Sequence, residues 1–214
     1  MLHSLLLLTC MLQTIATQSS YHPVTFDIMR QLGSESDKTY THAYHRSYPT
    51  LFASQNIHRF STFKMLEIGF GQGGSVSLWE ELFPNAEITW IDYSDDLSRS
   101  SCIPGGSYCQ AGTRSRFYFG SQSNSQFLTS VVQQECSANV SSTFRVGSDF
   151  VGGLGRNISS TSLTPCFDII IDDGGHGYNQ QLISFRVLFP SALKPGALYI
   201  IEGKEIYFTD SPGY

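Results

Sequence analysis

The sequence predicts an α/β fold of the Rossmann-like type, with a doubly wound, mostly parallel sheet covered by helices. Short apolar runs alternate with amphipathic segments, as in βαβ units. A glycine-rich turn, Gly69–Gly73, joins the first predicted strand to a helix. The segment Phe167–His176, FDIIIDDGGH, reads as a buried strand that ends in two carboxylates, two glycines and an imidazole. Open α/β sheets carry their chemistry at such carboxyl ends.

The predicted elements alternate along the chain. The first strand is Phe63–Gly69, and the helix after the glycine-rich turn is Ser75–Phe83, in which apolar residues recur at helical spacing. The other elements are, in order, the strand Ala86–Ile91, the strand Phe117–Phe119, the helix Gln126–Glu135, the strand Phe167–Ile171, the helix Asn179–Leu188 ended near Pro190, the turn Lys194–Gly196 and the strand Ala197–Ile201. Because the chain ends at Tyr214, we expect the sheet to be truncated after this fifth strand.

Length and composition limit the classes of protein. A chain of 214 residues can bury one sizeable core, and 41% hydrophobic and 13% aromatic residues argue against disorder. The net charge of −5 gives no basic surface, so nucleic acid is not an expected partner. We divide the chain into a signal peptide at 1–17, an N-terminal cap of helices and loops at 18–62, and the Rossmann-like domain at 63–214. The oligomeric state is not predicted.

The first residues resemble a secretion signal. The apolar run Leu5–Ala16 is too short for a stable membrane span and suits the hydrophobic part of a signal peptide; an amphipathic or buried helix is the alternative. Two sequons, at Asn139 and Asn157, lie within a Ser- and Gly-rich insert at 136–166. Together these features predict a glycoprotein of the secretory pathway or the extracellular space.

The cysteines agree with an oxidising compartment. Four remain after signal removal, and we favour the two local disulfides Cys102–Cys109 and Cys136–Cys166. Four cysteines allow three connectivities, and four reduced thiols in a cytosolic protein are the alternative.

The glycine-rich turn predicts a nucleotide-type cofactor. Glu67 precedes Gly69, Gly71 and Gly73, whose small size lets the backbone approach a ligand closely. Asp92 ends the next strand, where a carboxylate can accept hydrogen bonds from ribose hydroxyls. A tight turn without a ligand is the alternative. The glycine spacing differs from the dinucleotide pattern, which argues against a nicotinamide-dependent oxidoreductase.

A set of motifs carries a resemblance to a known family. They are DKxxTHxY from Asp37, MLEIGFGQGGS, WIDYS, IDDGGH followed by Gln180 or Gln181, and LKPGALYIIEG. Together, over about Ser36 to Gly203, they resemble class I S-adenosylmethionine-dependent methyltransferases, specifically metal-dependent O-methyltransferases that include macrolide-sugar methyltransferases. The resemblance implies S-adenosyl-L-methionine and Mg²⁺ or another divalent cation as cofactors. It places Glu67 near the methionine end of the cofactor and implies that Asp92 binds the ribose.

The resemblance also assigns the strand-end groups. Asp173 and Glu202 would be metal ligands, as suits carboxylate oxygens and Mg²⁺, and His176 would be the base that removes the acceptor's hydroxyl proton. Asp172 would contact the cofactor, or it would hold the metal ligands in place without binding the metal itself. The alternatives are helix capping by Asp172 and Asp173 and a surface-loop role for His176.

The chain departs from the family pattern at two site positions. Gly203 stands where the family usually has an aspartate, so one metal ligand is missing. Ser121 stands where an acid usually faces the adenine, beside Gln122, which we also place at the cofactor.

We therefore predict an O-methyltransferase that acts on a hydroxyl of a small molecule or sugar. The alternative is a secreted, catalytically inactive methyltransferase-like binding domain or a truncated gene product.

Overall fold

The computed structural model describes residues 21–34, 36–93, 115–137, 146–147 and 163–203. The predicted signal peptide, the Cys102–Cys109 pair and both sequons lie outside the described residues.

The sheet is parallel throughout its described strands, in the order β4-β3-β2-β1-β5-β6. β1 (Lys64–Ile68) pairs with β2 (Glu87–Asp92) on one side and with β5 (Phe167–Asp172) on the other. The outer strands are β3 (Ser115–Phe119), the short β4 (Val146–Gly147) and β6 (Leu193–Ile201). The strand order reverses at β1, so a crevice opens at the carboxyl ends of β1 and its neighbours, and the predicted Rossmann-like class is confirmed.

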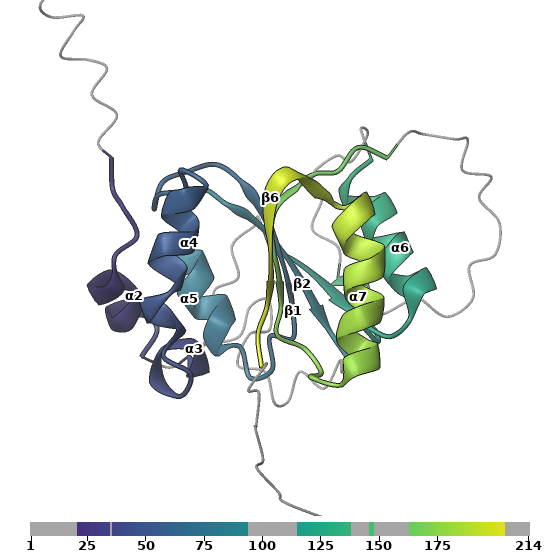
Figure 1. Ribbon diagram of the computed structural model, residues 1–214, viewed down its shortest axis with the longest axis horizontal. Helices are drawn as coiled ribbons and strands as arrows, with labels where there is room; N and C mark the ends of the chain where they lie inside the picture. Colours follow the sequence, from purple (N-terminus) through teal and green to yellow (C-terminus); the bar gives the residue numbers. More distant parts are fainter. Residues whose placement is uncertain (1–20, 35, 94–114, 138–145, 148–162, 204–214) are drawn as a thin grey trace, which may run out of the picture.

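Helices cover both faces of the sheet (Figure 1). The N-terminal helices and α5 (Gly74–Leu82) lie on one face, over an aromatic-rich core that includes Phe52, Trp79 and Trp90. The N-terminal elements are α2 (Phe26–Leu32), α3 (Asp37–Tyr40), the 3₁₀ turn η1 (Tyr44–Arg46) and α4 (Tyr48–Ser54). α6 (Ser125–Glu135) and α7 (Tyr178–Ser191) cover the other face over a mostly aliphatic core. No described helix is long and apolar enough to span a membrane.

Strand alternation decides which face each strand-end acid joins. Successive side chains of a strand point to opposite faces. On β1, Met65 belongs to the aromatic core and Leu66 to the aliphatic core, so Glu67 points toward the N-terminal helices. On β5, Ile171 belongs to the aromatic core, so Asp172 points toward α6 and α7.

The last predicted helix and strand are longer in the structure. α7 continues through Pro190 to Ser191, because proline near the end of a helix removes only one of the last backbone hydrogen bonds. The predicted turn at Lys194–Gly196 lies within β6, where the pairing with β5 is irregular between Phe167 and Ile169. The residues that predicted a turn therefore lie in a bulge at the start of β6.

The disulfide Cys136–Cys166 is confirmed. It joins the residue after α6 to the residue before β5, with 5.3 Å between the two Cα atoms and 30 residues of sequence separation. The predicted insert at 136–166 therefore begins and ends at two residues that a covalent bond holds together.

Candidate active site

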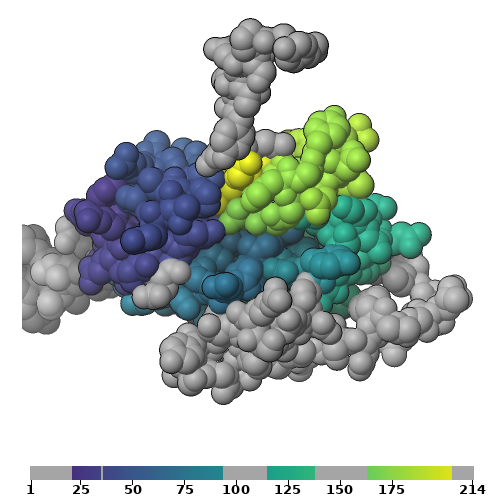
Figure 2. Space-filling model, turned by 90° about the horizontal axis from the view of Figure 1, so that it is seen from below, coloured from purple at the N-terminus to yellow at the C-terminus, as the bar shows by residue number. Residues whose placement is uncertain are grey.

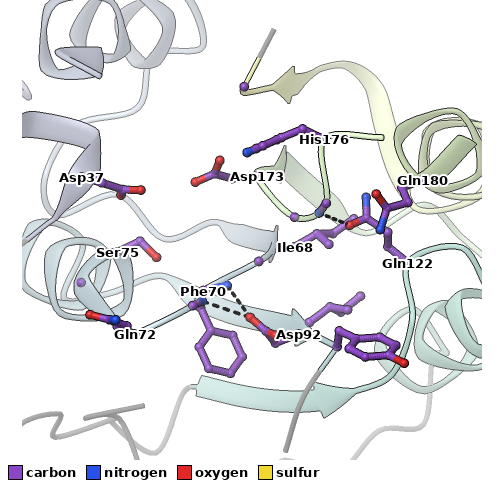
Figure 3. A pocket seen from close by; sticks show the side chains of 18 of the residues that line it. Asp37, Ile68, Phe70, Gln72, Ser75, Asp92, Gln122, Asp173, His176 and Gln180 are labelled. Carbon is purple, nitrogen blue, oxygen red and sulfur yellow. Dashed lines mark hydrogen bonds between the residues drawn. The ribbon is translucent and has the colours of Figure 1, made fainter. Parts of the chain in front are cut away.

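A cavity of about 580 Å³ opens at the carboxyl ends of the central strands. Figure 2 looks onto this edge, where the N-terminal helices stand on one side of the central strands and α6 and α7 on the other. The lining comes from the glycine-rich turn, the ends of β2, β3 and β5, and the α3–η1 segment. Asp92 lies on one side of the cavity, and Asp173 and His176 lie on the opposite side (Figure 3). The volume is within the range of small-molecule sites.

The glycine-rich turn follows β1 tightly and is held by Asp92. Gly69 and Gly71 have φ values of 84° and 49°. A Cβ at Gly69 would lie 2.3 Å from the backbone oxygen of Asp173, so only glycine fits there. The Oδ2 atom of Asp92 accepts hydrogen bonds from the backbone N–H groups of Phe70, at 3.1 Å, and Gly71, at 3.0 Å (Figure 3). Asp92 thus shapes the turn from a position on the cavity wall.

Asp172 does not reach the cavity, contrary to its predicted contact with the cofactor. The side chain is fully buried on the face of α6 and α7, as strand alternation requires. Its carboxylate accepts hydrogen bonds from Ser184 Oγ and from Gln122 Nε2, at 3.1 Å. Burial raises the pKa of Asp172, and the hydrogen bond from Ser184 opposes that rise.

Gln122 lines the cavity, but its amide links two strand ends. Nε2 donates to Asp172, and Oε1 accepts from the backbone N–H of Gly175 at 2.5 Å (Figure 3). A Cβ at Gly174 would lie 2.2 Å from the same oxygen. Gln122 therefore holds the Asp173–Gly175 turn in place, a role that the sequence did not suggest.

A lysine joins the acids at the ends of three strands. The Lys38 Nζ atom lies 3.2 Å from Glu67 Oε1, 2.7 Å from Asp173 Oδ2 and 3.0 Å from Glu202 Oε1. Tyr48 donates a hydrogen bond to Glu202 Oε1. We call these five residues the Lys38 cluster. The cluster brings three predicted site residues together, but only Asp173 among them lines the cavity.

Burial and charge act against each other in the Lys38 cluster. Burial alone would lower the pKa of Lys38, but the surrounding carboxylates outweigh burial and raise that pKa above its ordinary value. Burial raises the pKa of Glu202 to about 8, although Lys38 opposes the rise. Burial likewise raises the pKa of Glu67, against the effect of Lys38. Glu67 and Glu202 therefore hold protons more tightly than glutamates in water.

Glu67 has a second partner on the helix that follows the glycine-rich turn. Trp79 donates a hydrogen bond from Nε1 to Glu67 Oε2. The indole is fully buried in the aromatic core, so α5 holds one oxygen of Glu67 while Lys38 contacts the other.

His176 lies at the cavity wall beside the end of β6. A Cβ at Gly203, which has a φ of 70°, would lie 2.2 Å from His176 Nδ1. The backbone N–H of Gly203 donates to the Tyr44 hydroxyl at 3.2 Å, so η1 holds this end of β6. The imidazole is exposed and near Asp173, in a position to meet an acceptor entering the cavity.

Lys38 contacts both predicted Mg²⁺ ligands, Asp173 and Glu202. Both carboxylate oxygens of Glu202 bond to Lys38, at 3.0 and 3.1 Å, and one oxygen of Asp173 bonds to the same ammonium. Gly203 supplies no side chain. Among the described residues, no group of three His, Cys, Asp or Glu side chains is placed to hold a metal ion. Asp173 and Glu202 remain predicted metal ligands, but a lysine now lies between them.

Several residues of the site carried no predicted role. Lys38, Tyr48 and Tyr44 come from the N-terminal segment and contact groups far along the chain. Lys38 and Tyr44 belong to the DKxxTHxY motif, so the resemblance was the signal that could have found them. No local pattern marks Tyr48 or Ser184, because their partners are more than ten residues away.

The chain is similar to O-methyltransferases that act on sugar hydroxyls. It is 26% identical over 163 residues to 8-demethyl-8-(2-methoxy-α-L-rhamnosyl)-tetracenomycin-C 3′-O-methyltransferase from Streptomyces olivaceus, covering 73% of this chain and 31% of that protein. It is 28% identical over 152 residues to mycinamicin VI 2″-O-methyltransferase from Micromonospora griseorubida, covering 68% and 28%. The chain thus spans about a third of the length of these relatives. No protein-family profile matches the sequence.

Solved structures agree on the fold. The MycE methyltransferase of the mycinamycin biosynthetic pathway, in complex with Mg, S-adenosylhomocysteine and mycinamycin VI, superposes with a TM-score of 0.54 at 24% identity. The match covers 81% of this chain and 38% of that one. The Rossmann-like fold is therefore common to both.

Proposed function

We propose that this chain is part of an S-adenosyl-L-methionine-dependent O-methyltransferase that acts on a hydroxyl of a sugar or small molecule. One observation carries the proposal: the glycine-rich turn, Asp92 and the Asp173–His176 segment line one cavity at the switch point of the sheet. The similarity to sugar O-methyltransferases supports it over 152 residues or more.

The cavity suits the cofactor by its chemistry. Gly69 and Gly71 have no side chains, so the methionine part of the cofactor can lie close to their backbone. A Cβ placed at Gly71 would have no atom within 4 Å, so the space beside this residue is open. Asp92 offers a carboxylate at the end of β2 for a ribose. The cofactor, when bound, supplies an electrophilic methyl group on a sulfonium.

The protein's part in the reaction is positioning and proton transfer. The acceptor hydroxyl would enter beside His176 and lose its proton to the exposed imidazole while its oxygen attacks the methyl carbon in line; the methyl C–S bond would break and S-adenosylhomocysteine would leave. Asp173, fixed by Lys38, would keep a negative charge beside the imidazolium that forms. A divalent cation would be held by Asp173 and Glu202 and would lower the pKa of the acceptor hydroxyl.

Calorimetric titration of the full chain with S-adenosylhomocysteine tests the cofactor. We expect saturable binding with a Kd below about 1 mM. Asp92→Ala removes the acceptor for two amides of the glycine-rich turn and should weaken binding about tenfold. Asp168→Ala is the matched control, because Asp168 accepts a hydrogen bond from the Lys64 amide at the other end of the sheet. No saturation at millimolar ligand contradicts the proposal.

Methyl transfer to a sugar tests the reaction. Isotopically labelled cofactor and methyl α-L-rhamnopyranoside should give an O-methyl glycoside, and His176→Ala should slow that step by about 10² to 10⁴. The same variant should bind S-adenosylhomocysteine like the parent.

A second function is the catalytically inactive binding domain. The glycine at position 203 favours it, because that position supplies no acid beside His176. Tight S-adenosylhomocysteine binding without transfer to any glycoside would support this second function.

We also propose that the chain works in an oxidising compartment. The Cys136–Cys166 disulfide and the predicted signal peptide support this location. Fusion of residues 1–25 to a reporter, with secretion as the readout, tests it.

A further inference from the structure

We infer that the N-terminal segment forms the acceptor side of the cavity, where the Asp37 carboxylate and the stacked rings of His42 and Tyr44 bind a pyranose ring. The inference rests on the proposed function, because it names the residues that select the acceptor at the same site. Its test measures glycoside binding, so the inference and the cofactor proposal can fail separately.

The N-terminal segment supplies one wall of the cavity. Asp37, His42 and Tyr44 line the cavity, and they come from α3, from the loop that follows it and from η1. The backbone N–H of His42 donates to the Asp37 carbonyl at 2.9 Å, so a tight turn joins these two residues. The groups expected at the cofactor belong instead to the glycine-rich turn and to the end of β2. The N-terminal wall is therefore the part of the cavity that meets the second substrate.

This wall lies beside the predicted base. The Tyr44 hydroxyl accepts a hydrogen bond from the backbone N–H of Gly203 at 3.2 Å. A Cβ at Gly203 would lie 2.2 Å from His176 Nδ1, so the same glycine lies against the imidazole. In Figure 3 the Asp173 carboxylate lies between Asp37 and His176. A sugar ring bound at this wall would therefore present a hydroxyl to His176.

Two stacked rings give the wall an apolar surface. The ring centroids of His42 and Tyr44 lie 5.4 Å apart, with an interplanar angle of 19°. Tyr44 packs against the aromatic core and is bonded to Gly203, whereas His42 is exposed. A pyranose has an apolar face of C–H groups that can pack against a flat ring. Because Tyr44 already anchors the stack, binding to it orders few additional torsions.

Asp37 gives the wall a hydrogen-bond acceptor. Its side chain is exposed, and within the part of the chain that the structure describes no cation forms an ion pair with it, unlike Asp173, which is paired with Lys38. A carboxylate accepts several hydrogen bonds and donates none when ionised. Neighbouring hydroxyls of a pyranose can satisfy both of its oxygens, whereas an alcohol with one hydroxyl cannot. The carboxylate and the stack together therefore favour a ring with several hydroxyls.

Saturation-transfer difference NMR with methyl α-L-rhamnopyranoside tests the inference on the full chain, with S-adenosylhomocysteine and Mg²⁺ present. The wild type should bind the glycoside with a Kd of about 1 mM, and cyclohexanol at least about tenfold more weakly. His42→Ala and Asp37→Ala should each raise the Kd of the glycoside about tenfold, and His42→Phe, which keeps a flat ring, should restore binding. Cyclohexanol binding as tight as that of the glycoside, or unchanged binding in both alanine variants, would overturn the inference.

Two matched controls lie away from the cavity. Asp27→Ala removes an exposed acid from the first turn of α2, as Asp37→Ala does from α3. Phe189→Ala removes an exposed ring from the Phe185–Phe189 stack on α7, whose centroids lie 4.8 Å apart. Both controls should keep the Kd of the glycoside within about twofold. A tenfold rise in either control would contradict a binding site at the N-terminal wall.

Calorimetry with S-adenosylhomocysteine separates the inference from the proposed function. His42→Ala and Asp37→Ala should bind this ligand within about threefold of the wild type. A tenfold loss in Asp37→Ala would assign that acid to the cofactor and overturn the inference. A wild type that binds S-adenosylhomocysteine but not the glycoside would also overturn it and leave the methyltransferase proposal intact. Glycoside binding that depends on His42 and Asp37, without binding of S-adenosylhomocysteine, would support the N-terminal wall and contradict only the proposed function.

Discussion

Two buried charge clusters stand at opposite ends of the same sheet and have opposite compositions. The Lys38 cluster, at the carboxyl ends, places one ammonium among three carboxylates. At the amino ends, Glu135 forms ion pairs with Lys64 at 2.8 Å and with Arg116 at 2.9 Å, and accepts a hydrogen bond from Tyr118 at 2.7 Å. We call these four residues the Glu135 cluster.

The difference separates a structural ion pair from a functional site. In the Glu135 cluster two cations contact one buried acid, and Arg116 also pairs with the exposed Glu87, so the buried charge is compensated. In the Lys38 cluster the acids outnumber the cation, and the excess negative charge faces a cavity through Asp173. Burial raises the pKa values of Glu67 and Glu202 in this cluster, and perturbed acids at a cavity are typical of functional sites.

Removal of the single cation should have the largest effect. Lys38→Met leaves three buried carboxylates without a counter-ion and should lower the free energy of unfolding by about 3–5 kcal/mol. Lys64→Met leaves Glu135 with Arg116 and Tyr118, so its cost should be about 1–2 kcal/mol. Urea denaturation measures both. Equal losses would show that the two clusters are energetically alike.

Alanine substitutions at two glycines should show which backbone segment at the carboxyl ends of the strands is rigid and which can adapt. Gly69→Ala places a Cβ against the backbone of Asp173 at positive φ, so it should cost about 3 kcal/mol and weaken S-adenosylhomocysteine binding. Gly203→Ala meets only the His176 ring, which can rotate away, so about 1 kcal/mol is expected. Denaturation and calorimetry compare them. The reverse order would mean that β6, not the turn, is rigid.

Stability should depend on pH through the Lys38 cluster. The pKa of Glu202 is raised from 4.5 to about 8, so the folded state binds a proton that the unfolded state releases. The contribution is complete below about pH 4.5 and is lost as the pH rises through 8, with a slope of at most about 1.4 kcal/mol per pH unit. Denaturation from pH 5 to 9 measures it. Glu202→Gln should flatten the curve; an unchanged slope would place the titrating proton elsewhere.

Single hydroxyls should have the smallest effects. Tyr48→Phe removes a fully buried donor to Glu202 and should cost about 1–2 kcal/mol. Tyr118→Phe removes a half-buried donor to Glu135, which keeps two cations, and should cost about 0.5–1 kcal/mol. Thermal unfolding of both variants makes the comparison, and a larger loss at Tyr118 would refute the ranking.

The sequence predicted the sheet well because local patterns dictate it. β-Branched runs and helical spacing placed β1, β5 and α5 within one or two residues, and the glycines marked the turn at the cavity. The same patterns placed Asp92, Asp173 and His176 at one edge, and the structure brings these three to one cavity.

The parts that could not be predicted depend on distant contacts. Asp172 and Asp173 are adjacent in sequence, yet strand geometry sends the first into the aliphatic core and leaves the second at the cavity. Gln122 was expected at the cofactor, but its amide is engaged by two strand ends. The position of Lys38 among the acids required the tertiary fold, because no local pattern pairs a helix near the N-terminus with β6.

The long-range pairing of Lys38 also has a consequence for synthesis on the ribosome. Lys38 precedes Asp173 by 135 residues and Glu202 by 164 residues. Because the ribosome adds about 5–20 residues per second, Glu202 is made roughly 10–30 s after Lys38. The helices that carry it can form earlier, but the ion pairs cannot. Assembly of the site therefore cannot precede synthesis of the strand that follows α7.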